Sequence, residues 1–428
     1  MNGSRKSPAG RLARIADELR TSLWLWPALA GLLGAVAAEF LVRLDRSLDG
    51  DTPGRLTYGG DADAAQAVLS TIAGASMTVL GVTISLTLAV LALAAQGYTP
   101  RVLTRFMRDR GVQAVVASLI GTFTFSLGAL RLVRDDQVPG ITVNVAVLAA
   151  LASLGILIGF FHHLASEIRV ERVIAGAWAD SLPAIGGLAP LGGDPGAGEV
   201  VLGPPSADVR AGRTGRVLWV DEGAVMGVAR ACGSTVVVIP PVGGFICEGE
   251  TVARCHGGRP PGESERAAVT GAVQVGTQRT HAGDISYGLR QLTDIALRAL
   301  SPGVNDSTTA HEAILRAGDL LRRLADRDLG LRLRDADGAL LLVRERPDWD
   351  DLVGLCIDQV AAGAEGQADA ATMLVLLDTL TRVAAATNDP ERLGVLRGRA
   401  RRILDGARRS LPEPRDLERV EQAAKALS

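Results

Sequence analysis

The sequence has almost no lysine: Lys6 and Lys425 are the only two among its 428 residues. This scarcity excludes a Walker A phosphate loop, a Schiff-base lysine inside a site, and a lipoyl or biotinyl attachment lysine, because each needs lysine at a set place. Aromatic residues make up only 4% of the chain, and the formal net charge is −2. A nearly neutral chain gives no indication of a nucleic-acid partner.

Cysteine is scarce as well, and its spacing does not suggest a metal site. The four cysteines all lie in the second half of the chain, and none forms a Cys-x-x-Cys pair. Cys255 and His256 follow Cys247 by eight residues, which is poor spacing for zinc ligands. We therefore predict reduced, partly buried thiols at Cys232, Cys247, Cys255 and Cys356, with no metal and no cofactor.

The first third of the chain, in contrast, is rich in long apolar runs. Residues 23–42, 64–100, 112–130 and 141–161 are each long enough to cross a hydrocarbon core of ~30 Å. The first run is too long for a cleavable signal peptide, although the N-terminus before it is basic. The sequence therefore predicts four transmembrane helices. The second run would exceed ~45 Å as a helix at ~1.5 Å per residue, so it must tilt or project from the bilayer.

The charged residues between these runs indicate the orientation. Residues 1–22 and the loop between the second and third runs are rich in arginine, whereas the loop between the first and second runs is dominated by aspartate. Cytoplasmic loops of membrane proteins carry an excess of basic residues. We therefore expect a multi-pass protein of the bacterial inner membrane with both termini in the cytosol. Termini on the same side require an even number of spans, and four spans meet this requirement.

The second run has two distinct faces at ~100° per residue. Small residues at three- and four-residue spacing let helices approach closely in lipid, so one face is expected to pack against a neighbouring span. The opposite hydroxyl face either bonds back to its own helix or lines a pore or oligomer axis. The packing face comprises Thr71, Gly74, Thr78, Gly81 and Ser85, and the candidate pore face comprises Ser76, Thr83 and Thr87. The run carries no charge at mid-membrane, which argues against a proton-coupled carrier.

The fold class predicted for the whole chain is a membrane α-helical part of four transmembrane helices followed by a cytosolic α+β region. Residues 166–213 read as a juxtamembrane helix and a Gly/Pro-rich linker. Residues 214–276 form a small β module, with strands expected at 217–220, 235–239, 245–255 and 272–275. Residues 277–428 form a mainly helical domain with one strand at 339–343. Before these regions, residues 1–22 are a cytosolic N-terminal segment and residues 23–165 are the transmembrane domain.

The densest polar stretch surrounds a helix predicted at residues 285–300. Ser301-Pro302-Gly303 stops this helix, and Asn305-Asp306 opens the next one with Asp306 as the N-cap. Two interpretations stay open: a ligand site formed by donors, carboxylates and helix-terminal amides, or a helical hairpin whose side chains satisfy their own backbone. No nucleophile–base pair is recognisable, so no catalytic residue is assigned. The polar residues concerned are Arg279, His281, Asp284, Asp294, Arg298, Asn305 and Asp306.

This stretch carries a resemblance to a known family. The run RQLTDIALRALSPGVNDSTTA resembles the signature of predicted bacterial membrane proteins grouped as domain of unknown function 2254. The runs STIAGASMTVLGVTISLTLAV, GYTPRVLTRFMRDRGVQ and FFHHLASEI also look like that family. A proline commonly follows the Asn-Asp pair in the family, whereas Ser307 stands here. The resemblance implies the same membrane topology over nearly the whole chain and implies no activity or ligand.

Three functions are compatible with these observations. The first is an oligomeric channel-like or transport-related protein whose cytosolic domain senses or assembles, with the lipid bilayer and further copies of the chain as partners. The second is a membrane-anchored enzyme with a site around Arg279, His281, Asp284, Asn305 and Asp306. The third is a non-catalytic scaffold that recruits partners to the membrane. Ion flux would favour the first function, and chemical activity would favour the second.

Overall fold

The computed structural model describes residues 25–47, 58–97, 110–134, 138–167, 170–191, 202–277, 279, 284–335, 337–344 and 347–427. The chain divides into two compact units, Met1–Arg169 and Val170–Ser428. The division falls close to the boundary at residue 165 that the sequence predicts between membrane and cytosolic parts.

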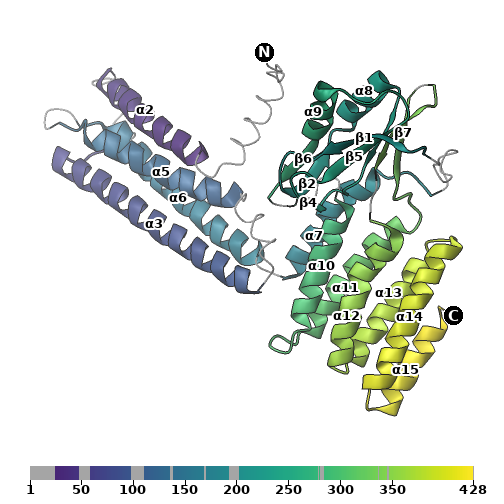
Figure 1. The fold of residues 1–428 in the computed structure, drawn as a ribbon. Helices are drawn as coiled ribbons and strands as arrows, with labels where there is room; N and C mark the ends of the chain where they lie inside the picture. The colour runs from purple at the N-terminus through teal and green to yellow at the C-terminus, as the bar shows by residue number, and fades with distance from the viewer. Residues whose placement is uncertain are drawn as a thin grey trace. The chain divides into compact units, whose positions relative to one another are not determined.

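The first unit is a bundle of long apolar helices (Figure 1). Its helices are α2 (Leu25–Ser47), α3 (Ala62–Gly97), α5 (Arg110–Leu130) and α6 (Gly140–Glu167). Each has the length and composition needed to cross a membrane, which confirms the four predicted spans. The 36 residues of α3 extend over about 54 Å at 1.5 Å per residue, well beyond a hydrocarbon core.

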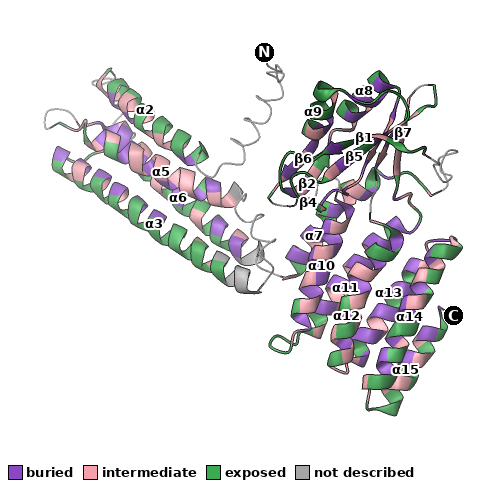
Figure 2. Ribbon diagram, viewed as in Figure 1, coloured by how far each residue is buried: buried purple, intermediate pink, exposed green. Residues whose placement is uncertain are grey.

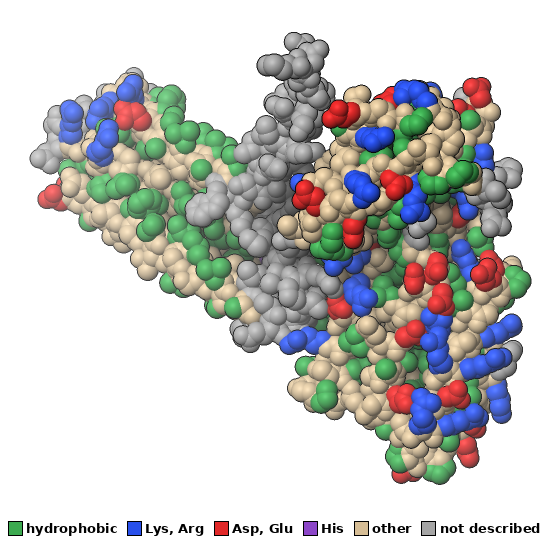
Figure 3. Space-filling model, in the orientation of Figure 1, with side chains coloured by type: hydrophobic (Ala, Val, Ile, Leu, Met, Phe, Trp, Pro, Cys, Tyr) green, Lys and Arg blue, Asp and Glu red, His purple; other side chains and the backbone are tan. Residues whose placement is uncertain are grey.

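The surface of this bundle is apolar. Large side chains such as Leu32, Leu148 and Ile158 are more than half exposed within the single chain (Figure 2). Charged side chains are sparse along these helices and dense over the second unit (Figure 3). An apolar exterior of this extent is what a bilayer, as opposed to water, accommodates.

The closest helix contact in the bundle joins α2 to α5 and depends on glycine. A Cβ atom on Gly34 would lie 2.5 Å from both the Gly121 carbonyl oxygen and Thr124 Oγ1. A Cβ on Gly128 would lie 2.9 Å from the Ala38 Cβ. Small residues allow such backbone approach between helices in lipid. Glycine-mediated packing therefore lies between the first and third spans of the chain.

One end of the bundle is fixed by polar contacts from the last turns of α2. Asp45 accepts hydrogen bonds from the backbone N–H groups of Ile141 and Thr142, at 3.2 and 2.9 Å, and from Thr142 Oγ1 at 2.7 Å. Arg46 donates to the Leu132 carbonyl at 3.0 Å. The Asp45 carboxylate satisfies N–H groups in the first turn of α6, where a negative charge also complements the helix dipole.

The second unit begins with α7 (Val170–Gly186), which is built into the helices that follow it. Trp178 donates from its indole nitrogen to Asp319 Oδ2 at 2.9 Å, and the guanidinium groups of Arg316 and Arg323 lie over its ring at 5.3 and 5.6 Å. A Cβ on Gly288 would lie 1.7 Å from Ser181 Oγ and 3.2 Å from the Ala177 carbonyl oxygen, so only glycine fits against α7 at this position. The helix that follows the fourth span is thus an integral part of the second unit.

A mixed β part comes next, with two sheets and two helices around one core. Its elements are β1 (Pro205–Arg210), β2 (Gly215–Val220), α8 (Glu222–Cys232), β3 (Thr235–Val238), β4 (Phe245–Ile246), β5 (Thr251–His256), α9 (Glu263–Ala272), β6 (Val273–Gly276), β7 (Leu331–Arg334) and β8 (Leu340–Arg344). The larger sheet has the order β1-β5-β3-β8-β7, and the smaller has the order β4-β2-β6. All neighbours are antiparallel except the parallel pair β3 and β8.

The expected α+β class and most of the expected strands are confirmed, with corrections at the edges of the β part. Residues 205–210, predicted as linker, form β1 because they pair with β5. The strand expected at 339–343 is β8, which joins the larger sheet beside β3, so the β part is not confined to residues 214–276. The helices α8 and α9 were missed, since short helices between strands leave little periodic signal.

The rest of the chain is an array of helices (Figure 1). These are α10 (Ile285–Ala299), α11 (Ser307–Leu324), α12 (Trp349–Gly366), α13 (Ala370–Ala384), α14 (Pro390–Ser410) and α15 (Pro414–Lys425). The apolar face of α10 consists of Leu289, Leu292, Ala296 and Ala299, which are all buried. This helix contacts α7, α11 and α12 and so joins α7 to the array.

Candidate functional site

Two apolar clusters hold α3, α5 and α6 together at different heights along the first unit. The first cluster contains Ala38, Ala65, Leu69, Phe125, Ala129, Val143 and Ala146. The second cluster contains Leu80, Val115, Leu119, Phe160 and Leu164. Each cluster draws residues from α3, α5 and α6, so both are cross-sections of the same bundle. The segments between them therefore form its middle.

Buried hydroxyl groups occupy this middle region. Ser76 lies between the two clusters along α3, Thr122 along α5 and Ser153 along α6, and none is more than 7% exposed. Ser126, one turn from Thr122 on α5, is fully buried at the level of the first cluster, between Phe125 and Ala129. Thr122 Oγ1 and Ser153 Oγ share a hydrogen bond of 2.8 Å, and Ser153 Oγ also lies 3.4 Å from the Ser118 carbonyl. We call Ser76, Thr122, Ser126 and Ser153 the hydroxyl layer.

One member of the hydroxyl layer has unused hydrogen-bonding capacity. Ser126 Oγ is buried without a hydrogen-bond partner among the described residues. Leaving a hydroxyl unpaired in an apolar environment costs about 1–3 kcal/mol on the scale of protein mutational data. Hydroxyl groups can donate and accept hydrogen bonds, and their oxygens can ligate cations, so this layer could hold a small polar solute or a monovalent cation.

The candidate pore face of the second span points into the bundle of its own chain. Ser76 and Thr83 are buried, and Thr87 Oγ1 donates to the Thr83 carbonyl at 2.7 Å. The face is therefore packed against α5 and α6, which are the helices that α3 contacts. A helical period defines two faces but does not tell which of them the other helices cover.

The opposite, glycine face of α3 is exposed in the single chain, so its expected packing stays a prediction. We expected it to pack against a neighbouring span, yet a Cβ on Gly74 or Gly81 would have no atom within 4 Å. Thr78 is exposed and donates to the Gly74 carbonyl at 2.9 Å, and Ser85 is exposed as well. The chain instead buries the face of α3 that carries Leu69 and Leu80. Among the described residues of one chain, Gly74 and Gly81 on this face thus meet no other helix.

The polar stretch of the second unit begins with a buried ion pair. Arg279 donates from Nε and Nη2 to the Asp284 carboxylate, at 2.9 Å for both bonds. Ser286 Oγ donates to Asp284 Oδ1 at 2.9 Å, and the guanidinium also lies over the Tyr287 ring. Gly243, with φ +86°, is required here because a Cβ would lie 2.1 Å from Asp284 Oδ2. The Arg279–Asp284 ion pair is thus enclosed by Ser286, Tyr287 and Gly243.

The Asn305-Asp306 turn begins α11, as the sequence predicts. Asn305 has a left-handed φ of +49°, which asparagine tolerates better than most residues. Asp306 accepts from the Thr309 backbone N–H at 3.1 Å and from Thr309 Oγ1. The hydrogen bond from that hydroxyl lowers the pKa of Asp306, so its carboxylate is a charged N-cap at neutral pH.

These two parts of the polar stretch lie far apart. Asp284 is the residue before α10, whereas the Asp306 backbone N–H donates to the Ala299 carbonyl at the other end of that helix. The 15 residues of α10 span about 22 Å. His281 lies outside the described residues. Asp294 is half-buried and Arg298 exposed on α10 between the two ends. The structure therefore does not assemble the seven predicted residues into one site.

A second cap beside Asp306 was missed by the sequence analysis. Asp369 begins α13 and accepts from the Thr372 backbone N–H at 3.0 Å and from Thr372 Oγ1 at 2.6 Å. His311 Nε2 of α11 lies 3.0 Å from Thr372 Oγ1, and Ser307 Oγ donates to Asp369 at 3.5 Å. The repeated Asp-x-x-Thr spacing was the available signal. These contacts join the first turns of α11 and α13. The capping aspartates also accept hydrogen bonds from backbone N–H groups of the helices that they begin.

Other features of the second unit offer no clear chemical centre. Within the described ranges, no three His, Cys, Asp or Glu side chains gather in a way that could hold a metal ion. Cys232, Cys255 and Cys356 are buried free thiols, and Cys247 is exposed. A groove of about 250 Å³ follows α12, α13 and α14, but its Arg399 and Arg409 are ion-paired with Asp350 and Glu365.

The fold defines a multi-pass membrane protein with four apolar helices and a large α+β unit after them. The chain belongs to the family of predicted membrane proteins DUF2254, whose model matches residues 20–382. It is 28% identical to an uncharacterized protein of Mycobacterium tuberculosis and, equally, to one of Mycobacterium bovis. Each alignment covers 98% of this chain and 82% of the relative. No solved structure matches the chain.

Proposed function

We propose that this protein is an oligomeric, channel-like or transport-related protein whose second unit acts as a sensing or assembly domain. The observation that carries the proposal is the hydroxyl layer, in which Ser76, Thr122 and Ser153 lie between the two apolar clusters. Ser126, one turn away at the level of the first cluster, has no hydrogen-bond partner among the described residues, and such a hydroxyl is costly in a bundle held by apolar packing. Substrate sites near the bilayer midplane, closed on either side, are common in transporters.

The contacts of α7 support a role for the second unit in this process. Only residues 168 and 169 separate α6 from α7, and Trp178 and Ser181 fix α7 to α10 and α11. The helix that follows the last span along the chain is therefore part of the core of the second unit. The exposed glycine face of α3 supplies a surface on which a second copy of the chain could pack closely.

Removing one hydroxyl of the layer tests the transport proposal. Full-length protein in proteoliposomes is expected to conduct a monovalent cation or a small polar solute, and Thr122→Val should reduce this flux several-fold. Valine has the shape of threonine and removes only the hydroxyl that bonds Ser153. Thr78→Val, the same change on the exposed face of α3, should leave the flux unchanged. Absence of flux from the wild-type protein would contradict the proposal, as would equal flux through both variants.

We also propose that both termini lie in the cytosol of a bacterium. The arginine-rich residues 98–110 and the acidic loop after the first span support this orientation. A reporter active only in the periplasm should give signal when fused near Gly54, and one active only in the cytosol should give signal after Ser428. The reverse pattern of signals would invert the topology.

The membrane-anchored enzyme receives less support than the transport function. Asp284 and Asp306 lie at opposite ends of α10, and each is engaged in structural hydrogen bonds. A scaffold that recruits a cytosolic partner would be favoured over both if the reconstituted protein conducted nothing and co-purified with a defined partner.

A further inference from the structure

The smaller sheet, β4-β2-β6, has an outward face with an unexpected composition. Arg216 on β2 pairs with Phe245 on β4, and Trp219 pairs with Gln274 on β6. Cross-strand partners point to the same side of a sheet. Gly276 on β6 is the other cross-strand partner of Arg216. A Cβ on Gly276 would be 2.7 Å from Leu218 Cδ1, so Leu218 lies on this side of the sheet too. We call Arg216, Leu218, Trp219, Phe245 and Gln274 the outer face.

The other side of the same sheet already forms the core. Val217, Val220, Val273, Val275 and Ile246 belong to the apolar cluster of the β part. An antiparallel sheet with one packed face normally presents polar side chains on the other. Here Trp219 is 45% exposed and Phe245 is 59% exposed. A contiguous exposed group of large apolar side chains of this kind indicates a binding surface.

The chemistry of the outer face fits a lipid surface. Tryptophan and phenylalanine have large apolar rings, and tryptophan is enriched at the level of the lipid headgroups. Arg216, the single charged residue of the face, lies over the Phe245 ring at 5.8 Å from its centroid. An arginine in this position can keep its stem on the apolar surface while its guanidinium binds lipid phosphate. The face carries no acidic residue that anionic lipid would repel.

The connection to the membrane helices supplies the second argument for this occupant. Only residues 168 and 169 separate α6 from α7 along the chain, so the second unit is covalently tethered close to the last membrane helix. A bilayer is thus permanently present at high effective concentration, which no diffusing partner matches. We propose that the outer face docks on the bilayer, with Trp219 and Phe245 at headgroup depth and Arg216 bound to lipid phosphate.

The native cysteines allow a direct test in the full-length protein. Cys247, two residues after Phe245, is exposed, whereas the other three cysteines are buried. Burial raises the pKa of Cys356 to about 12 and also raises the pKa values of Cys232 and Cys255, so a thiol-specific spin label should react at Cys247. In nanodiscs of phosphatidylcholine and phosphatidylglycerol, this label should collide frequently with oxygen and rarely with a water-soluble nickel chelate.

Variants of the outer face provide the decisive comparison. Trp219→Ser combined with Phe245→Ser should increase the nickel collision rate several-fold, because the label would then leave the lipid. Val304→Ser removes a comparably exposed apolar side chain, 52% exposed, in the turn before α11, and should change nothing. A chain with Cys247→Ser and Val304→Cys carries the label at residue 304 and serves as the reference. If the label at Cys247 in the wild type collided with nickel as often as this reference label, the proposal would be overturned. Dipolar broadening between labels would also overturn it, in favour of a second copy of the chain.

Discussion

Replacing Gly34 by leucine is expected to separate the first span from the third and to destabilise the membrane unit strongly. A Cβ at this position would lie 2.5 Å from the Gly121 carbonyl oxygen and 3.2 Å from the Phe125 backbone nitrogen. These are backbone atoms, which cannot rotate away as a flexible side chain would. Overpacking typically costs 1–3 kcal/mol, and a clash with backbone should reach about 3 kcal/mol or more. The thermal stability of the detergent-solubilised chain measures the effect.

Gly74→Leu on α3 is the matched control for this substitution. A Cβ there has no atom within 4 Å, so the melting temperature of the single chain should stay level or rise slightly, since leucine favours helix over glycine. A loss of assembly with unchanged melting would mean that the glycine face of α3 is an interface between copies. Equal destabilisation by Gly34→Leu and Gly74→Leu would contradict the observed α2–α5 contact.

The membrane half could be predicted from the sequence in number and length of helices, but not in how they pack. Four uncharged runs of sufficient length leave few alternatives, because a chain in lipid must satisfy its backbone within helices. Gly31 and Gly34 are three residues apart and Gly74 and Gly81 are seven residues apart, so both pairs place small residues on one side of a helix. Only the first pair meets another helix, and local spacing does not reveal which glycines have a partner.

The polar turn illustrates the same limit in the second unit. The Asp306 cap could be predicted because a cap is local, formed within four residues of chain. The pairing of Asp284 with Arg279 is almost as local, but the requirement for glycine at residue 243 comes from a distant turn. The missed strand β1 pairs with β5, more than 40 residues away, which local propensity does not detect.

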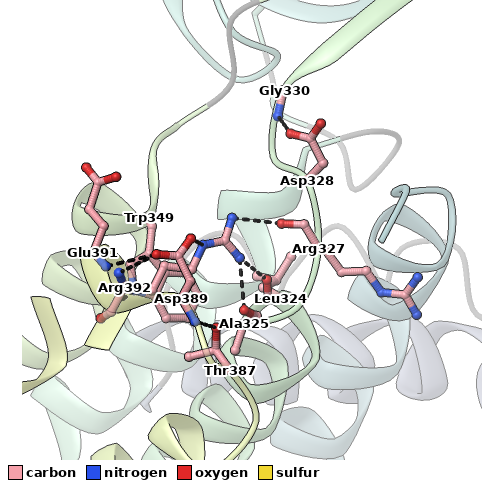
Figure 4. Close-up of polar contacts among 10 residues, drawn as sticks. All are labelled: Leu324, Ala325, Arg327, Asp328, Gly330, Trp349, Thr387, Asp389, Glu391 and Arg392. Carbon is pink, nitrogen blue, oxygen red and sulfur yellow. Dashed lines mark hydrogen bonds and ion pairs between the residues drawn. The ribbon is translucent and has the colours of Figure 1, made fainter. Parts of the chain in front are cut away.

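Arg392 forms the most extensive polar contact of the helical array (Figure 4). Its Nη1 donates to the carbonyls of Leu324 and Ala325, both at 3.0 Å, and its Nη2 donates to the Arg327 carbonyl at 2.8 Å. The guanidinium lies over the Trp349 ring, 5.2 Å from its centroid, and the Trp349 indole donates to the Arg392 carbonyl at 3.3 Å. Burial lowers the pKa of Arg392, although the nearby Asp389 carboxylate counteracts this. The side chain thus satisfies the last carbonyls of α11 from α14.

Arg392→Met is therefore expected to destabilise the second unit severely while keeping a long apolar stem over Trp349. Three carbonyl groups would lose their donor in a place where Arg392 itself is only 8% exposed. An unsatisfied buried group costs about 1–3 kcal/mol, so the total loss should be at least about 3 kcal/mol. Arg392→Lys should recover only part of it, because an ammonium group cannot reproduce the planar fork of guanidinium donors. Thermal unfolding of the full-length chain, followed by tryptophan fluorescence, reports the change through Trp349.

Arg382→Met is the control that separates this contact from a general loss of charge. Arg382 pairs with Asp378 on the surface of α13 at 2.8 Å, and its side chain is 66% exposed. Exposed pairs of this kind contribute about 0–1 kcal/mol, because water and salt screen the charges and the side chains lose entropy in pairing. The melting temperature should accordingly fall far less than with Arg392→Met. Similar losses for the two variants would mean that α14 is held to the end of α11 by apolar packing, with the Arg392 hydrogen bonds adding little.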